Sequence, residues 1–386
     1  MTRELNLIAF VVFATTLFMR TVDPIIPQIA IGLGVTATTA ALLSSGFTLP
    51  YALIQPLLGA LADMLSKTRL IVVCMVGLSA ITIVASFATS FEVMMACRVL
   101  AGAAAGGVFP IALAITGDRV PVRQRQVAIS RILFAAMSGN LLGASGAGII
   151  ADLIGWRSVF FVTAAFGLFA LAVAIPSFRG MKEQQGRFDW STFVPNYRAV
   201  FRNPLAKYCF GAVFMEAIFM FGVFPYMATL LHTEGVKQAS IAGIVLAGFG
   251  VGGIGYTMAI SWLLHFGAQR LMAAGGMIMA GCLVVISLRV PWPVEFANFI
   301  VLGFGFYTMH ACIQVFVTEL APAARGSAMA GHSAFFFFGQ AIGPVIYGLG
   351  LQSIGMAPVL LTGAVVLAIT GWVCALRLRH APQPLR

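Results

Sequence analysis

The sequence predicts an all-α integral membrane protein, with twelve membrane-spanning helices arranged as two pseudo-symmetric bundles of six. The first observation is composition, because 60% of the 386 residues are hydrophobic, only 9% are charged and the mean hydropathy is +0.98. A soluble protein of this length would carry roughly 95 charged residues, so the few present cannot cover a soluble surface. The other two observations are a series of long apolar runs and an internal repeat. Composition also excludes a disordered chain, a collagen-like fibre and a secreted disulfide scaffold.

The apolar runs are each close to the length of about 20 residues that crosses a bilayer as a helix. Short loops join them. The first run is too long for the core of a signal peptide, so we expect it to remain as the first span. The expected spans are residues 5–29, 41–62, 69–87, 91–116, 127–150, 157–177, 206–231, 241–263, 269–288, 294–317, 326–349 and 356–377.

The distribution of positive charge predicts the orientation in the membrane. The net charge is +11, and most of the 23 Lys and Arg residues lie in loops of one parity. The loops of the other parity carry only Arg157, Lys237 and Arg289. Because cytoplasmic loops are enriched in Lys and Arg, we expect a multi-pass protein of the inner (cytoplasmic) membrane with both termini in the cytoplasm. The basic excess then reflects insertion into the membrane, and we expect no nucleic-acid partner.

A shift of about 200 residues aligns the two halves of the chain. Pro24 then meets Pro225 and Pro121 meets Pro322, and glycines match in the same order through both halves. This pattern is typical of a six-span unit duplicated in tandem. In transporters built from such repeats, the substrate path lies between the halves near the bilayer midplane. The expected parts are an N-terminal bundle over 1–178, a cytoplasmic linker over 179–205 and a C-terminal bundle over 206–386.

Two carboxylates, Asp23 and Glu216, fall well inside spans, whereas the other acidic residues lie near span ends or in loops. A charge at such depth costs at least about 2.5–3.5 kcal/mol, so it is retained where it is paired, hydrated or useful. Counting about 1.5 Å per residue puts Asp23 and Arg98 at a similar depth, and Arg20 lies one turn from Asp23. All four residues are candidates for proton coupling, and a fixed ion pair between spans 1 and 4 is the alternative.

Further polar side chains within spans are expensive against lipid and should face the bundle interior. By the same count, Glu216 lies roughly 15 Å from the cytoplasmic face, and two histidines lie roughly 9–10 Å from it. These groups could form a second titratable cluster. Each of these polar side chains could line a substrate cavity or form hydrogen bonds between helices, and the sequence favours neither role. The residues are Gln55, Asn140, His310, Gln314, His332 and Gln340.

No constellation typical of enzyme chemistry occurs in the sequence. Ser/His/Asp, HExxH and CxxC spacings are absent, and the six cysteines fall singly within spans. We therefore expect no enzyme activity, no bound metal and no cofactor.

Three segments resemble motifs of the major facilitator superfamily. The loop between spans 2 and 3 is similar to the family's loop signature through Gly59, Asp63, Lys67 and Arg69, although Met64 and Ser66 depart from it. The resemblance implies that Asp63 latches a cytoplasmic gate at a neighbouring helix N-terminus. The other two segments are glycine-rich stretches of spans 4 and 5. With their counterpart in span 11, they supply the expected helix-packing residues Gly102, Gly106, Pro110, Gly139, Gly143, Gly339, Gly343 and Pro344.

Span 1 ends in Asp23 and Pro24, and span 6 opens with Trp156 and Arg157. Both features resemble the drug-efflux branch of that superfamily, as does the glycine-rich span 5, where Ala144 stands in place of the motif's Pro. The resemblance implies a proton-coupled exporter of small amphipathic compounds, driven by the proton gradient and working by alternating access as a single chain in the lipid bilayer.

Three other activities stay open at this point. An uptake permease could bind an organic anion with Arg20 and Arg98. A passive channel or an uncoupled facilitator would carry a solute without proton flux. The sequence does not distinguish the direction of transport among these alternatives.

Overall fold

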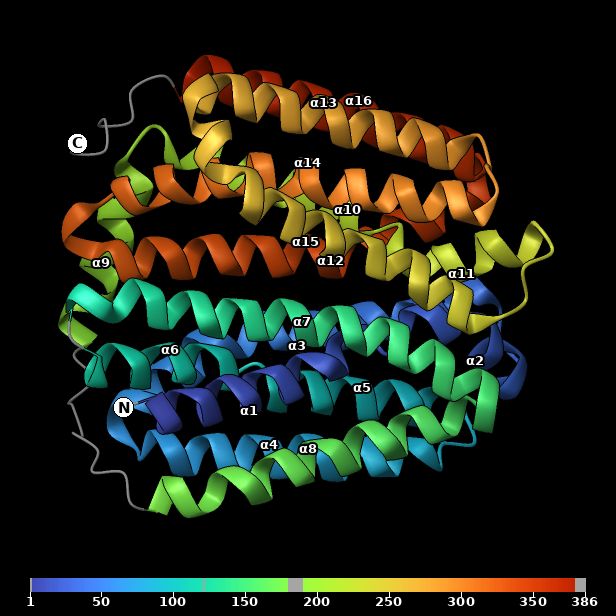
Figure 1. The fold of residues 1–386 in the computed structure, drawn as a ribbon, viewed down its shortest axis with the longest axis horizontal. Coiled ribbons are helices and arrows are strands. Elements are labelled where there is room, and N and C mark those ends of the chain that lie inside the picture. The colour runs from blue at the N-terminus through green and yellow to red at the C-terminus, as the bar shows by residue number, and fades with distance from the viewer. Residues whose placement is uncertain (1, 121, 180–189, 379–386) are drawn as a thin grey trace. The chain divides into compact units, whose positions relative to one another are not determined.

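The computed structural model describes residues 2–120, 122–179 and 190–378, and this part of the chain is built almost entirely from helices (Figure 1). Within it, twelve helical segments are long and apolar enough to cross a membrane. The predicted all-α fold class and the predicted number of spans are therefore confirmed. Each span is helical because a helix satisfies its main-chain N–H and C=O groups internally, where lipid offers no hydrogen-bond partner.

The bounds of the helices follow the apolar runs closely. The first half contains α1 (Thr2–Arg20), the 3₁₀ helix η1 (Asp23–Ile25), α2 (Ile26–Leu33), α3 (Ala37–Met64), α4 (Lys67–Ser86), α5 (Phe91–Ala105), α6 (Val108–Arg119), α7 (Val122–Ile154) and α8 (Trp156–Arg179). The second half contains α9 (Trp190–Arg202), α10 (Ala206–Phe221), α11 (Phe224–Thr233), α12 (Ala239–Leu263), η2 (Leu264–Phe266), α13 (Ala268–Ser287), α14 (Trp292–Glu319), η3 (Pro322–Ala324), α15 (Arg325–Ser353) and α16 (Met356–Arg377).

Spans 1 and 7 are each interrupted at a proline. Span 1 covers Glu4–Leu33 and span 7 covers Ala206–Thr233, and both consist of more than one helix. Pro24 is the second residue of η1 and Pro225 is the second residue of α11. Proline lacks an N–H and clashes with the preceding turn, so it is tolerated where a helix begins and not where one continues. The two prolines that the repeat pairs therefore mark equivalent breaks.

The chain divides into two compact units. The first unit comprises Met1–Phe188 and Pro225–Leu246, and the second comprises Asp189–Phe224 and Ala247–Arg386. Helix α12 therefore begins in the first unit and ends in the second. The boundaries predicted from the sequence, 1–178, 179–205 and 206–386, stay a prediction.

The two units repeat the same helix pairings. In the first unit α1 packs on α7 and α4 packs on α8, which joins spans 1 and 5 and spans 3 and 6. In the second unit α10 packs on α15 and α13 packs on α16, which joins spans 7 and 11 and spans 9 and 12 (Figure 1). The pseudo-symmetry predicted from the internal repeat is thus present in the helix contacts.

Glycines set the distance between the paired helices. A side chain at Gly102 would collide with the main chain of Phe47, and one at Gly303 would collide with the main chain of Phe249. These two contacts are equivalent in the repeat. In lipid there is no hydrophobic force between helices, so close van der Waals approach of backbones supplies much of their association. Four further glycine–carbonyl contacts follow the same rule, Gly139 with Phe13, Gly143 with Leu17, Gly339 with Phe214 and Gly343 with Ile218.

Replacement of Gly102 by Ala should therefore destabilise the protein. The added methyl group has no space beside the Phe47 carbonyl, and overpacking of this kind costs about 1–3 kcal/mol in the free energy of unfolding. Thermal unfolding of the purified protein in detergent measures the loss. The matched control is Gly281→Ala in α13, where no atom lies within 4 Å of the new methyl group. Equal melting temperatures for the two variants would contradict the packing role of Gly102.

Candidate functional site

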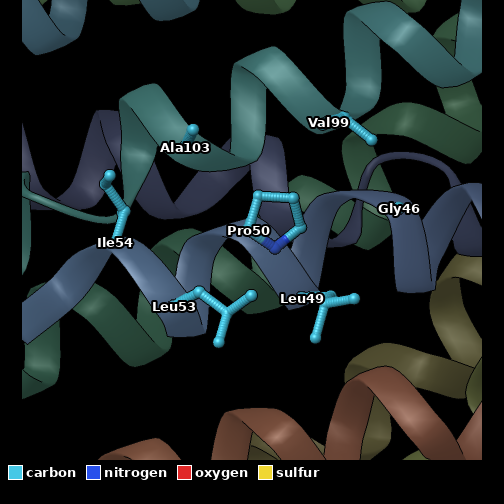
Figure 2. A pocket seen from close by; sticks show the side chains of 7 residues that line it. All are labelled: Gly46, Leu49, Pro50, Leu53, Ile54, Val99 and Ala103. Carbon is cyan, nitrogen blue, oxygen red and sulfur yellow. The ribbon is translucent and has the colours of Figure 1, made fainter.

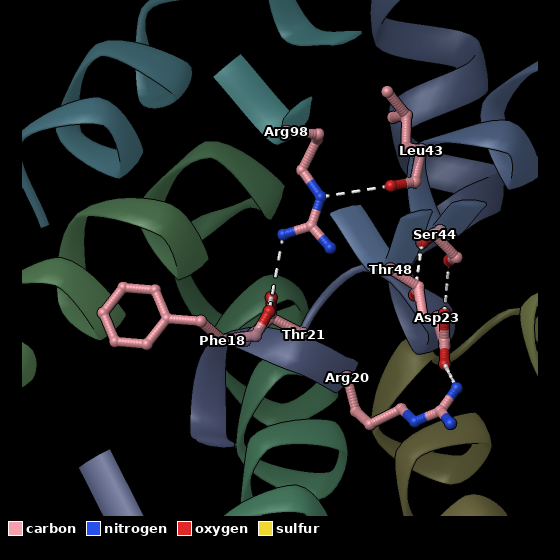
Figure 3. A network of polar contacts seen from close by, with 8 residues as sticks. All are labelled: Phe18, Arg20, Thr21, Asp23, Leu43, Ser44, Thr48 and Arg98. Atoms are coloured by element: carbon pink, nitrogen blue, oxygen red, sulfur yellow. Dashed lines mark hydrogen bonds and ion pairs between the residues drawn. The ribbon is translucent and has the colours of Figure 1, made fainter. Parts of the chain in front are cut away.

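Asp23 lies at the break between α1 and α2 and is completely buried. Its Oδ2 accepts a hydrogen bond from Nη1 of Arg20 at 3.2 Å, which is also an ion pair. Its Oδ1 accepts from the hydroxyl of Ser44, on α3, at 2.6 Å (Figure 3). A carboxylate held this way joins spans 1 and 2 and has a charged partner on only one of its two oxygens.

The local sequence explains why Asp23 points inward. Helix α1 ends at Arg20, and Asp23 is the first residue of the short η1 helix, so it lies at a break whose polar main chain needs partners. Arg20 is three residues away, which brings the guanidinium to the carboxylate within one turn. Sequence reasoning found both residues but missed Ser44, because nothing in the sequence says which face of span 2 turns toward span 1.

Arg98 lies close to this site but binds main-chain carbonyl groups. From α5, its Nε donates to the carbonyl of Leu43 at 3.2 Å and its Nη1 donates to the carbonyl of Phe18 at 3.4 Å (Figure 3). The guanidinium also stacks over the ring of Phe47, 4.3 Å from the ring centre. Phe18 is in the last turn of α1, where carbonyls have no partner within the helix. Arg98 therefore fastens three spans together.

One guanidinium nitrogen of Arg98 makes no hydrogen bond in the described part of the chain. Its Nη2 is buried without a hydrogen-bond partner among the described residues. The ion pair of Asp23 is with Arg20, on its own span, so the bonds described here do not form the fixed pair between spans 1 and 4 that the sequence left open. A buried guanidinium nitrogen without a partner is costly, and it can donate a hydrogen bond to a carboxylate or to a polar atom of a substrate.

A second polar cluster lies within the second unit. Oε2 of Glu216, on α10, is 2.8 Å from Nδ1 of His310 on α14. Nε2 of the same histidine is 3.3 Å from Nε2 of Gln314, one turn along α14. The ring of His332, on α15, lies 4.9 Å from the His310 ring. The structure thus brings together four residues that the sequence placed on three spans.

This cluster is enclosed by aromatic rings and has unsatisfied atoms. Phe306 and Phe336 lie 4.7 and 5.0 Å from the His310 ring, centre to centre. Oε1 of Glu216 and Nε2 of His332 are buried without hydrogen-bond partners among the described residues. Counting residues along the spans separated Glu216 from the histidines in depth, because that count assumes helices parallel to the membrane normal. The contact puts them at one level.

The other predicted cavity residues are not gathered at either cluster. Nε2 of Gln55, on α3, and Oδ1 of Asn140, on α7, are buried without hydrogen-bond partners in the described part of the chain. Gln340 is buried in α15. Their orientation toward the bundle interior and their roles in a cavity stay predictions.

The cytoplasmic gate motif is described only in part. Gly59 and the side chain of Asp63 lie outside what the structure describes in detail. Lys67 is buried and pairs with Asp118 at the end of α6, while the main-chain N–H of Arg69 donates to the Ser66 hydroxyl. Sequence reasoning missed Asp118 because it grouped this acid with those near span ends or in loops.

A groove of about 360 Å³ lies between α3 and α5 in the first unit (Figure 2). Its lining is almost wholly apolar, and none of the predicted cavity residues lines it. The lining residues are Gly46, Leu49, Pro50, Leu53, Ile54, Val99 and Ala103. It offers no group that could orient a polar substrate.

Comparison with known proteins gives a consistent result over most of the chain. A family model described as the Major Facilitator Superfamily matches residues 8–322. The chain is 28% identical over 356 residues to a chloramphenicol resistance protein of Streptomyces lividans, with 89% of this chain and 88% of that protein covered. It is 24% identical over 354 residues to the quinolone resistance protein NorA of Staphylococcus aureus, with 90% of each covered.

A solved structure shares the fold. It is that of a bacterial homolog to the human lysosomal transporter Spinster, in an inward-facing and unoccupied conformation. The TM-score is 0.78 at 16% sequence identity, over 99% of this chain and 98% of the other. At that identity the likeness bears on the fold alone.

The contacts of Arg98 predict that lysine cannot replace it. An ammonium group lacks the planar fork that reaches two carbonyls at once, so Arg98→Lys loses at least one of the two hydrogen bonds between spans. We expect the free energy of unfolding to fall by about 1–3 kcal/mol, measured by thermal unfolding in detergent. The exposed Arg270 supplies the control, because Arg270→Lys should leave the melting temperature unchanged. A stable Arg98→Lys protein would show that these carbonyl bonds do not hold the spans together.

Proposed function

Because the chain belongs to the Major Facilitator Superfamily, whose members are membrane transporters and not enzymes, we propose that it is a proton-coupled exporter of small amphipathic compounds. The observation that carries this proposal is Asp23, a completely buried carboxylate that forms an ion pair with Arg20 on the same span. The resemblance to two drug-resistance proteins supports export of amphipathic compounds.

Asp23 suits the role of a proton carrier because its ionised and protonated forms differ sharply in what they bind. The carboxylate holds the Arg20 guanidinium at 3.2 Å. A proton on Asp23 removes that attraction. Movement of the two groups apart during the cycle would break this contact. This change in contact would couple a proton to the alternating-access cycle.

Glu216 and His310 supply a second place for a proton. Their atoms are 2.8 Å apart, and the pair is neutral overall when it holds one proton, on either group. Loss of that proton would leave an uncompensated buried anion, which is expensive away from water. Release would therefore require the cluster to open to water or to receive a cation, and either event would belong to the transport cycle.

The remaining features of the proposal follow from the sequence. Both termini lie in the cytoplasm, the membrane is the inner membrane, and one chain suffices because two bundles complete a substrate path. The proton gradient is the source of energy, and no cofactor is needed.

Uptake of an organic anion is the second candidate. The observation that favours it is the buried Nη2 of Arg98, which has no hydrogen-bond partner among the described residues. Together with Arg20 it could bind a carboxylate group. Transport of organic acids only, with loss in an Arg98→Gln variant that still folds, would favour this candidate over the exporter.

The test of the proposal is Asp23→Asn in liposomes that hold a pH gradient and an internal pH dye. The amide cannot carry a proton, so a panel of lipophilic cations should no longer trigger proton flux or gradient-driven transport. Exchange of substrate for substrate without a gradient should persist, because it needs no net proton movement. Glu319→Gln is the control, since that carboxylate is partly exposed and pairs with Arg325 outside the buried clusters. Full gradient-driven transport by Asp23→Asn would remove Asp23 from the mechanism.

A separate experiment tests the second cluster. Glu216→Gln keeps an oxygen that can accept from His310 but cannot release a proton, so the number of protons moved per substrate should fall. The ratio is measured from the pH dye and labelled substrate in the same liposomes. Glu295→Gln is the matched control, because Glu295 is also a buried acid of the second unit and accepts from Asn298. An unchanged ratio in Glu216→Gln would exclude Glu216 as a carrier.

A further inference from the structure

Asp152 joins three helices of the first unit at one point. It lies in the last turn of α7, where its Oδ1 accepts from the main-chain N–H of Ala239 at 3.0 Å. Its Oδ2 accepts from the main-chain N–H of Ser240 at 2.8 Å. The amide of Gln28, on α2, donates to Oδ1 at 3.3 Å. Both oxygens of this carboxylate are therefore bound to other spans.

The two main-chain donors are the first residues of α12. The first N–H groups of a helix have no partner within it, and that end of the helix carries partial positive charge. A serine, threonine, asparagine or aspartate just before the helix normally satisfies these groups, but Gln238 stands there. Asp152 thus caps α12 from another helix, and α12 has its cap only while it stays against α7.

Glycines bring the two helices into contact beside this cap. A side chain at Gly148 would collide with the main chain of Ala239. In the other direction, a Cβ at Gly243 would lie 2.7 Å from the carbonyl oxygen of Ala144 and 3.0 Å from Cα of Ser145. The backbones of α7 and α12 therefore touch directly, without side chains between them. No water-filled path can pass there while the contact persists.

The division of the chain makes this contact significant for movement. Residues 225–246 belong to the first unit, whereas α12 continues from Ala247 into the second. By the predicted topology, the ends of α2 and α7 and the start of α12 lie on the outer side of the membrane. Alternating access requires a path that opens on that side in one state. Parting α12 from α7 there would break both hydrogen bonds of the cap.

We propose that Asp152 is the latch of an outer gate, which holds the start of α12 against α7 until transport opens the outer side. This inference rests on the alternating-access cycle of the proposed function, but not on its proton coupling or substrate. Asp152 is a positioning residue, since it acts through the helix that it caps. These hydrogen bonds give a structural role to a carboxylate that the sequence alone placed in a loop.

The experiment measures how often the contact opens. A cysteine at Ser145, beside the α12 backbone, is labelled from outside with a membrane-impermeant maleimide. The six native cysteines are buried, and the chain without the new cysteine gives the background. With Asp152 present, labelling should be slow. In Asp152→Ala it should be about tenfold faster, which corresponds to a shift of about 1.4 kcal/mol toward the open state.

Two variants serve as controls for charge and for the carboxylate. Glu92→Gln removes an exposed acid from the first turn of α5, which is expected on the same side, and should leave the labelling rate unchanged. Asp152→Glu retains a carboxylate and should label more slowly than Asp152→Ala. Equal labelling rates with Asp152 and with Ala at this position would overturn the proposal.

A second variant tests the same gate without changing Asp152. Gly243→Ala leaves the cap residues intact but inserts a methyl group between α12 and the Ala144 carbonyl, so it should also speed labelling at position 145. A folded Gly243→Ala protein that labels at the parent rate would contradict the gate. Labelling needs neither substrate nor a proton gradient. A failure of the proton-coupling test would therefore leave the gate intact, and a failure of the gate test would leave proton coupling intact.

Discussion

The absence of hydrogen-bond partners in lipid is the constraint on which the rest of this structure depends. Every main-chain group that a helix leaves unsatisfied must find a partner inside the protein. Where α1 ends, the carbonyl of Phe18 accepts from both Thr21 and Arg98. Where α12 begins, its first N–H groups bind Asp152. Arg98 and Asp152 therefore complete the ends of helices, and Asp23 lies at one such break.

Glycine contacts determine which helices pack closely against each other. Paired glycines of the two halves, such as Gly102 and Gly303, let carbonyl-bearing backbones approach directly. Because the contacts recur in equivalent places, both units acquire the same helix pairings. A contact made only by small residues can also separate without exposing large apolar side chains. The same packing that holds each unit together is thus compatible with movement between states.

The two halves share a framework but not a chemistry. In the first unit a carboxylate, Asp23, is balanced by a permanently charged guanidinium on its own span. In the second, Glu216 is balanced by His310, which can be charged or neutral. An acid beside an arginine changes its charge when the arginine moves, whereas an acid beside a histidine can pass the proton to its partner. Duplication therefore supplied two polar sites in one framework that respond to different events.

The sequence by itself determined the membrane class, the twelve spans, the duplication, the family resemblance and the choice of Asp23 and Glu216 as buried acids. Each of these depends on hydropathy, charge or residue order, which are read along the chain. The tertiary structure alone decided the partners, because a side chain's neighbours depend on how each helix is rotated and tilted against the next. Hydropathy does not fix that rotation, whereas the glycine contacts do. The partners decided in this way are Ser44 for Asp23, His310 for Glu216, Asp118 for Lys67 and the start of α12 for Asp152.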